Sequence, residues 1–180
     1  MTKLHRLEKN RSKILTTISI SLSTFIIVVM GLNINTVFAE QTDTINKTRI
    51  VSAPINKVWN IISDVDKNSN YWPITDIKNI NKTGNTIERE VLTPPNNSKA
   101  HQFITLNPKE SIIENQTQGA ITGIKTITLS PVDSNANKTK ISVLWNLDLS
   151  NVPIFGKGFA KDNIGKSVDE ALNKIEKELQ

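Results

Sequence analysis

Three side chains in this sequence carry charge or acid–base chemistry within otherwise apolar patterns: Arg89, His101 and Lys125. Arg89 alternates with Ile87 and Val91, so a strand would place its guanidinium on their face. If that face is buried, the guanidinium must be paired, and the anionic head group of a ligand is one candidate partner. In the alternative, the two flanking glutamates face inward at a strand end and Arg89 is solvated.

Lys125 and His101 raise the same question of which way a strand turns them. Lys125 aligns with Ile127 and Leu129, so it either faces the core or extends its ammonium from a sheet edge into water. His101 is the single histidine after the N-terminal tail and the most plausible general base. The better inward set beside it contains Gln102, so we expect His101 on the outer face.

Aromatic residues are sparse, and four of them are candidates for a binding site or a core. Trp59 lies on the apolar face of a short helix and is expected to fill the core. Tyr71 and Trp72 directly precede Pro73, where they either line the rim of a pocket or pack in the interior. Trp145 lies on the apolar face of the last strand, as core or as cavity wall.

Several classes of chemistry find no support in the sequence. The absence of cysteine excludes disulfides, cysteine nucleophiles and thiolate metal sites. One histidine in the body gives no basis for a zinc site, and no nucleophile elbow, phosphate-binding loop or dinucleotide fingerprint is present. We therefore predict no metal and no cofactor, and assign no catalytic residue.

The N-terminal tail, residues 1–39, has the pattern of a signal peptide or signal anchor. Its basic start is followed by residues 14–32, a run without charge that is just long enough to span a bilayer, and Val37 and Ala39 fit a cleavage site after Ala39. Either interpretation places residues 40–180 outside the cytoplasm, secreted or membrane-anchored. The tail also holds the excess basic charge, so the nearly neutral body gives no case for nucleic acid binding.

Hydrophobic periodicity divides residues 40–180 into one strand, a short helix, six strands and a long helix. The short helix has its apolar face at 55, 58, 59 and 62, with Pro54 in the first turn and Ser52 near enough to cap it. Alternation and turn residues indicate strands at 44–52, 76–80, 86–92, 100–106, 111–117, 121–129 and 139–149.

The last segment, up to residue 180, is an amphipathic helix. Its apolar stripe comprises Ile164, Val168, Ala171, Leu172, Ile175 and Leu179, and Phe155, Phe159 and Ala160 could begin the same stripe. A sheet with one apolar face needs a cover, and this helix is the one long enough to provide it. The prediction is an α+β domain in which the sheet packs on the C-terminal helix.

This order of elements, the opening "APINKVWNIISDVDKNSNYWPIT" (53–75) and the ending "DNIGKSVDEALNKIEKELQ" (162–180) resemble the START-like superfamily, also described as SRPBCC, polyketide cyclase/dehydrase-like or Bet v 1-like. The resemblance covers about residues 44–180. It implies a helix-grip fold: a seven-stranded antiparallel sheet wrapped around the C-terminal helix, with two short helices after the first strand. It also implies an internal hydrophobic cavity.

Taken with the tail, the resemblance implies an exported protein that binds or transfers a lipid, isoprenoid or quinone-like molecule in that cavity. The candidate contacts are Tyr71, Trp72, Arg89, Lys125, Trp145 and Phe159. Membrane association would come from the N-terminal segment. Two alternatives remain open: a polyketide cyclase or dehydratase using His101, Arg89 or Tyr71, and an envelope interaction module without a ligand. We favour a binding protein over an enzyme.

Overall fold

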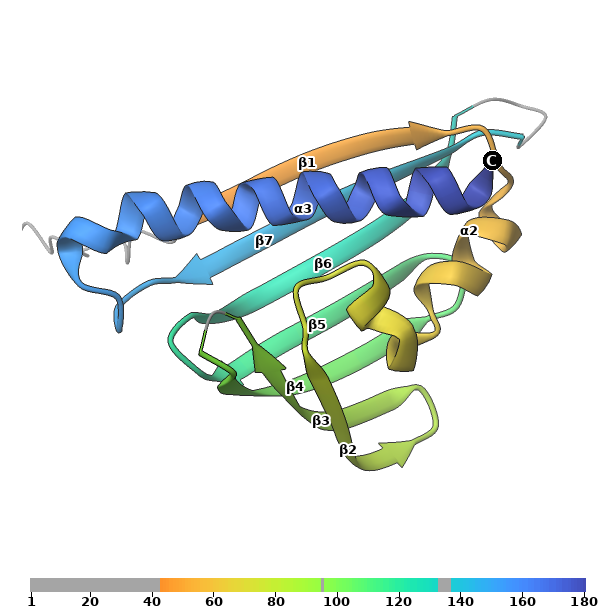
Figure 1. The fold of residues 1–180 in the computed structure, drawn as a ribbon. Helices are drawn as coiled ribbons and strands as arrows, with labels where there is room; N and C mark the ends of the chain where they lie inside the picture. The colour runs from red at the N-terminus through yellow and green to blue at the C-terminus, as the bar shows by residue number, and fades with distance from the viewer. Residues whose placement is uncertain (1–42, 95, 133–136) are drawn as a thin grey trace, which may run out of the picture. The chain divides into compact units, whose positions relative to one another are not determined.

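The structure is a computed structural model that describes residues 43–94, 96–132 and 137–180. Within these residues, seven strands form one antiparallel sheet in the order β1-β7-β6-β5-β4-β3-β2 (Figure 1). The strands are β1 (Asp43–Val51), β2 (Asp76–Thr83), β3 (Thr86–Thr93), β4 (Ser98–Asn107), β5 (Ser111–Gln118), β6 (Thr122–Pro131) and β7 (Thr139–Asp148). All seven predicted strands are confirmed, with ends that differ by up to three residues.

Four helical segments of the described part of the chain accompany the sheet. Two short ones follow β1, namely α2 (Ile55–Ile62) and the 3-10 helix η1 (Val65–Asn70), and η2 (Ile154–Gly156) leads into the long α3 (Lys157–Leu179). The helix-grip prediction is confirmed. The prediction for the start of α2 is wrong in detail: Pro54 is the N-cap rather than a first-turn residue, and no side chain caps the helix. The carbonyl of Pro54 accepts the amides of Lys57 and Val58 instead.

The concave face of the sheet is built by strict alternation of side chains. In β7 the side chains of Ile141, Val143 and Leu147 are buried, as the apolar pattern predicts. Gly123 in β6 meets this strand so closely that a Cβ would lie 2.1 Å from the carbonyl oxygen of Asn146, and its φ is +129°. Glycine is therefore required where β6 first approaches β7.

The long helix α3 lies along β1 and β7 and covers this half of the concave face (Figure 1). Its buried stripe is Val168, Ala171, Leu172, Ile175 and Leu179, with Ile164 partly buried, as predicted. The expectation that Phe155 and Phe159 begin the buried stripe is wrong, because they are 90% and 73% exposed. The apolar spacing continues at these positions, but the N-terminal end of α3 extends beyond the end of the sheet (Figure 1).

The other half of the concave face lies beneath α2 and η1. Val58 and Ile62 of α2 and Val65 of η1 are buried in the same core as the sheet, and Trp59 packs against that core while partly buried. Among the described residues, no helix is both long and apolar enough to cross a membrane. The predicted signal segment, the run 14–32 and the cleavage site after Ala39 lie outside the described residues.

Candidate functional site

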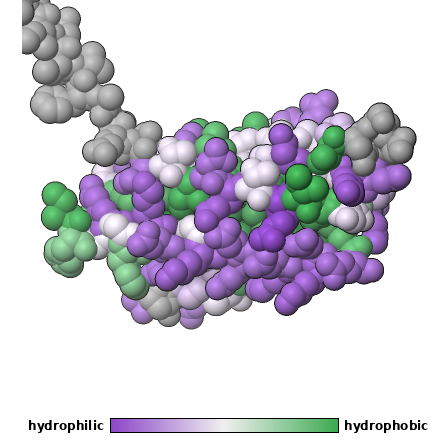
Figure 2. Space-filling view, turned by 90° about the horizontal axis from the view of Figure 1, so that it is seen from above, coloured by the Kyte–Doolittle hydropathy of each residue, from purple (hydrophilic) through white to green (hydrophobic). Residues whose placement is uncertain are grey.

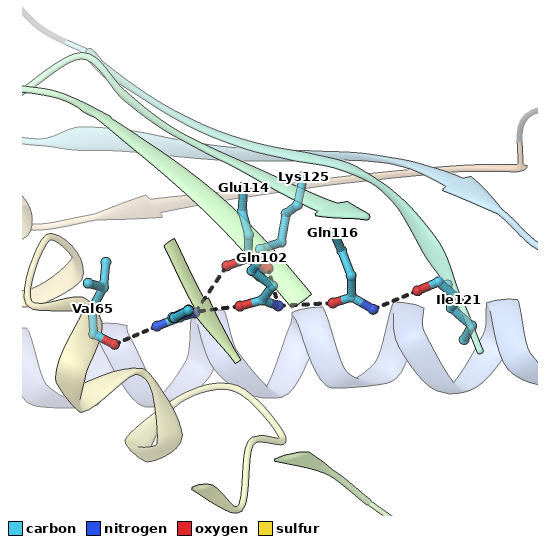
Figure 3. A network of polar contacts seen from close by, with 7 residues as sticks. Val65, Gln102, Glu114, Gln116, Ile121 and Lys125 are labelled. Carbon is cyan, nitrogen blue, oxygen red and sulfur yellow. Dashed lines mark hydrogen bonds and ion pairs between the residues drawn. The ribbon is translucent and has the colours of Figure 1, made fainter. Parts of the chain in front are cut away.

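Five polar side chains interrupt the apolar lining of the concave face where β3, β4, β5 and β6 lie side by side. Strand pairing places Arg89 opposite Gln102, Gln102 opposite Gln116, and Glu114 opposite Lys125. Because alternate residues of a strand share a face, these pairs fall into neighbouring rows on one surface. We call this set of five residues the polar network (Figure 3).

Arg89 is the most deeply buried member, with no exposed surface. Its Nε donates to Oε1 of Gln102 at 2.9 Å, and one terminal nitrogen donates to the carbonyl of Val65 at 2.8 Å. The other terminal nitrogen lies 3.5 Å from Oε2 of Glu114. The solvated alternative for Arg89 is therefore wrong: β3 turns Arg89 inward together with Ile87, and its flanking glutamates outward.

Glu114 is the shared carboxylate of the polar network. Its Oε1 lies 2.8 Å from Nζ of Lys125 and accepts a hydrogen bond from the amide of Gln102 at 3.1 Å. The same amide nitrogen of Gln102 donates to Gln116 at 2.9 Å, and Gln116 donates to the carbonyl of Ile121 at 2.6 Å. The network thus runs continuously from η1 to the start of β6 (Figure 3).

Lys125 is held between one carboxylate and two indole rings. Its Nζ lies 4.0 Å from the ring centre of Trp72 and 4.9 Å from that of Trp145, both within the range of cation–π attraction. The side chain is 3% exposed, so the alternative in which Lys125 extends from an edge into water is wrong. Lys125, Trp72 and Trp145 are separate candidates in the sequence, and the fold brings them together.

The electrostatics of the polar network are those of one carboxylate facing two cations. Burial lowers the pKa of Lys125, and the charge and hydrogen bond of Glu114 oppose that effect. Burial also lowers the pKa of Arg89, which Glu114 and the more distant Asp66 raise. When Lys125 is protonated, Arg89, Lys125 and Glu114 together carry one excess positive charge. Because the place is desolvated, this excess charge favours either loss of the proton from Lys125 or the binding of an additional anion.

Comparison with known proteins rests on structure, because no protein-family model and no curated protein matches the chain. A protein of Thermus thermophilus aligns over 76% of this chain and 97% of its own, with 14% identity and a TM-score of 0.64. The Zhui aromatase/cyclase from a Streptomyces species aligns over 77% and 94%, with 14% identity and a TM-score of 0.63. A START superfamily protein from Mycobacterium smegmatis aligns over 76% and 96%, with 14% identity and a TM-score of 0.61.

The domain has the START-like helix-grip fold. Its strand order and long C-terminal helix agree with the resemblance seen in the sequence. At 14% identity these alignments establish the fold and leave the function to the residues of this chain.

Tyr71 packs in the interior rather than at a wet rim. Tyr71 and Trp72 are each 5% exposed, and the hydroxyl of Tyr71 donates to Glu178 of α3 at 2.5 Å. Burial raises the pKa of Tyr71, and the hydrogen bond to Glu178 and the charge of that carboxylate raise it further. Tyr71 thus ties the segment after η1 to the end of α3, while Trp72 covers Lys125.

Two sequence candidates lie away from the polar network. Phe159 is on the exposed side of α3, where it contributes nothing to a site on the concave face. His101 is on the outer face, as predicted, with Nε2 3.0 Å from Glu88 and Nδ1 3.3 Å from Thr117. A general base acting on a molecule between sheet and helix would not be His101.

Three members of the polar network escaped sequence reasoning as site residues: Gln102, Glu114 and Gln116. The sequence does indicate that Glu114 and Gln116 face inward, because they alternate with Ile112 along β5 and so share its face. The residues that pair with Glu114 and Gln116 lie on other strands, however, and the register between strands is needed to identify them.

The domain also has a groove of about 180 Å³ at the β2 edge of the sheet. It is lined by Asp76, Lys78, Glu90, Val91, Leu92 and Lys99. None of the five residues of the polar network lines this groove, so the groove is separate from the network.

Proposed function

We propose that the domain binds a small hydrophobic molecule between the sheet and α3, with the polar end of that molecule against Lys125. The observation that carries the proposal is the buried Lys125–Glu114 pair with its two flanking indoles on the concave face. The apolar body of the ligand would gain roughly 25 cal/mol per Å² of buried surface, while a few polar groups fix its orientation.

The hydrogen-bonding capacity of Lys125 supports a ligand with an acceptor oxygen. An ammonium has three N–H donors, and Glu114 takes one of them. A carboxylate, phosphate or carbonyl oxygen placed where the Trp72 indole now lies would accept another. An anionic group would also balance the second cation of the polar network, which a neutral one would not.

Binding in this place requires Trp72 to move. The four most buried members of the polar network are at most 3% exposed, so their atoms contact protein on all sides. Because Trp72 follows η1, a change in this short segment would uncover Lys125 and leave the sheet intact. Lipids, isoprenoids and quinones are the ligand classes that we propose, for an exported domain acting at a membrane.

A cyclase or dehydratase acting on a polyketide-like substrate is the second candidate, favoured by the lowered pKa of Lys125. Burial lowers the pKa of Lys125 on the concave face, and in its deprotonated form this amine can act as a general base. Arg89 is fully occupied by its partners, and Tyr71 is occupied by Glu178. A His101→Ala variant is expected to retain any such activity, because His101 lies on the other face.

A third candidate is a module whose interior is filled by its own side chains. Every buried polar side-chain atom of the described residues has a hydrogen-bond partner. Such complete pairing agrees with a purely structural network.

Tryptophan emission and native mass spectrometry distinguish a ligand-binding domain from a filled module. Two of the three tryptophans flank Lys125, so a molecule that displaces Trp72 should change the emission of the protein. We expect a co-purifying small molecule, or a rise in melting temperature with a fatty acid, an isoprenoid alcohol or a quinone. A protein that is empty and indifferent to all three overturns the proposal.

A matched pair of lysine variants tests whether the polar network holds the ligand. Lys125→Met should weaken binding of the responding ligand by tenfold or more. Lys140→Met, at an exposed position of β7, should leave the affinity unchanged. Equal affinity in both variants would overturn the role of Lys125.

A further inference from the structure

The start of α3 exposes three large apolar side chains together. Ile154 and Phe155 of η2 are 87% and 90% exposed, and Phe159 of α3 is 73% exposed. The next most exposed large apolar side chain among the described residues is Ile50, at 52%. We call Ile154, Phe155 and Phe159 the apolar tip, and Figure 2 shows apolar residues protruding at the end of the domain where α3 begins.

Exposure of this degree has a cost in water that a partner would remove. Burial of such a side chain is favourable in proportion to the apolar area removed from water. Contiguous exposed apolar residues mark contact surfaces on soluble proteins, whereas single ones need no explanation. None of the three side chains belongs to the core of the domain, so their apolar character does nothing for the fold.

The chain enters the described domain beside the apolar tip. Nζ of Lys161 lies 3.0 Å from Oδ1 of Asp43, the first described residue, and Lys161 follows Phe159 by two positions. Figure 1 shows the start of β1 at the same end of the sheet as the start of α3. Ten residues, 33–42, connect Asp43 to the uncharged run 14–32. Fully extended they reach at most ~35 Å.

The charges around the apolar tip identify the kind of surface that it suits. Lys161 is paired with Asp43. The pKa of Asp148 is lowered chiefly by hydrogen bonding with Ser150, and the charge of nearby Lys157 lowers it slightly further. Both lysines therefore have acidic neighbours, which weakens any attraction to anionic head groups. Insertion of apolar side chains would supply the affinity, as for aromatic and aliphatic residues at a bilayer interface.

The geometry points to a lipid bilayer as the occupant of this surface: where the uncharged run 14–32 is retained as a signal anchor, Ile154, Phe155 and Phe159 insert into the same membrane. The ten connecting residues are short enough for a retained run 14–32 and the apolar tip to meet one membrane surface. The start of α3 would then face the lipid phase. This inference concerns the outer end of α3 and does not rest on ligand binding at Lys125.

The absence of cysteine from the chain allows a site-specific test. Phe155→Cys in the full-length protein carries an environment-sensitive dye, and the protein is reconstituted into phosphatidylcholine vesicles. We expect a blue-shifted emission with a several-fold higher yield, quenched by nitroxide-labelled lipid. The matched control is Ile50→Cys, an exposed apolar position at the far end of β1, whose dye should report water.

Four results would overturn the inference. In the first, the protein floats with the vesicles but the dye at position 155 still reports an aqueous environment. In the second, the dyes at positions 155 and 50 respond equally to the vesicles. The dye at 155 could respond to protein concentration without vesicles, which would make a second copy of the chain the occupant. Replacing part of the lipid by phosphatidylglycerol should change the signal less than twofold, and a strict need for anionic lipid would contradict the apolar account.

Discussion

The two halves of the concave face follow the same backbone geometry and have opposite contents. Beneath α3, the fully buried inward residues of β1 and β7 are mainly aliphatic, such as Ile45, Ile141 and Val143. Lys47 and Arg49 share this face of β1, but they are partly exposed and pair with acidic residues of α3. Beneath α2 and η1, the inward positions of β3, β4 and β5 include Arg89, Gln102 and Glu114. Alternation alone decides which residues are buried, and it does so whether or not they are apolar.

The difference shows where the molecule departs from the simplest solution for a core. The aliphatic half needs only shape and area, because its contacts are non-directional. The polar half needs every hydrogen bond in place, since a buried group without a partner is costly. Selection for stability alone would favour the first solution, so the second is where a function of the domain is to be sought.

The largest effect is expected from breaking the polar half at its shared carboxylate. Glu114→Gln leaves Arg89 and Lys125 buried without a counter-charge, which should lower the free energy of unfolding by about 3–5 kcal/mol. Denaturant unfolding monitored by circular dichroism measures the loss. Glu88→Gln is the matched control, because Glu88 pairs with His101 on the outer face and should cost no more than about 1 kcal/mol.

Replacing the charged members together tests whether the polar half exists for stability. Arg89→Met, Glu114→Leu and Lys125→Met in one protein should be neutral or stabilising by about 1–4 kcal/mol, because no charge is then left unpaired. The same protein should lose the ligand that the wild-type chain binds. Severe destabilisation of this triple variant would show that the polar network is a structural requirement of the fold.

The aliphatic half should respond to the loss of volume alone. Leu172→Ala removes a buried side chain of α3 that faces the sheet and should lower the free energy of unfolding by about 2–5 kcal/mol. Ligand affinity should fall less than in Lys125→Met, because Leu172 would contact only the apolar body of the ligand. A larger loss of affinity in Leu172→Ala than in Lys125→Met, at temperatures where both proteins are folded, would place the main anchor of the ligand under α3 rather than at Lys125.

Much of this comparison was accessible from sequence, and the remainder failed for identifiable reasons. The strands, α3 and the inward position of Gln102 follow from periodicity. The partnership of Arg89 with Glu114 does not, because it joins strands β3 and β5, and strand periodicity carries no register. Phe159 fits the helical stripe by spacing, and only the position where the sheet ends reveals that it has nothing to pack against.

Tyr71 connects the two halves, and its titration reports on that connection. It is the single tyrosine of the chain, so the ultraviolet absorbance of tyrosinate follows this residue alone. We expect ionisation well above the ordinary pKa of 10.0 in the folded protein, because of burial and of Glu178, and near 10 in denaturant. Above pH ~10 the unfolded state loses the proton first, so this contribution to stability declines as pH rises.

Glu178→Gln is the variant that separates the causes. It removes the carboxylate and leaves the burial of Tyr71, so the pKa should fall toward 10 without reaching it. A pKa that does not change would assign the whole shift to burial. A normal pKa in the wild-type protein would show that Tyr71 is solvated and that η1 is not held against α3.

The smallest effect is expected from the ion pair that borders the aliphatic half. Nζ of Lys47 lies 2.7 Å from Asp169 of α3, as close as Lys125 lies to Glu114, but the two side chains are 37% and 44% exposed. Water screens this pair and the long lysine side chain gives up conformational freedom to form it, so Lys47→Ala should cost ~0–1 kcal/mol. Urea unfolding at low and high salt measures the cost. A loss comparable to that of Glu114→Gln would mean that distance rather than burial governs the energetics of ion pairs in this domain, and the contrast between the two halves would then fail.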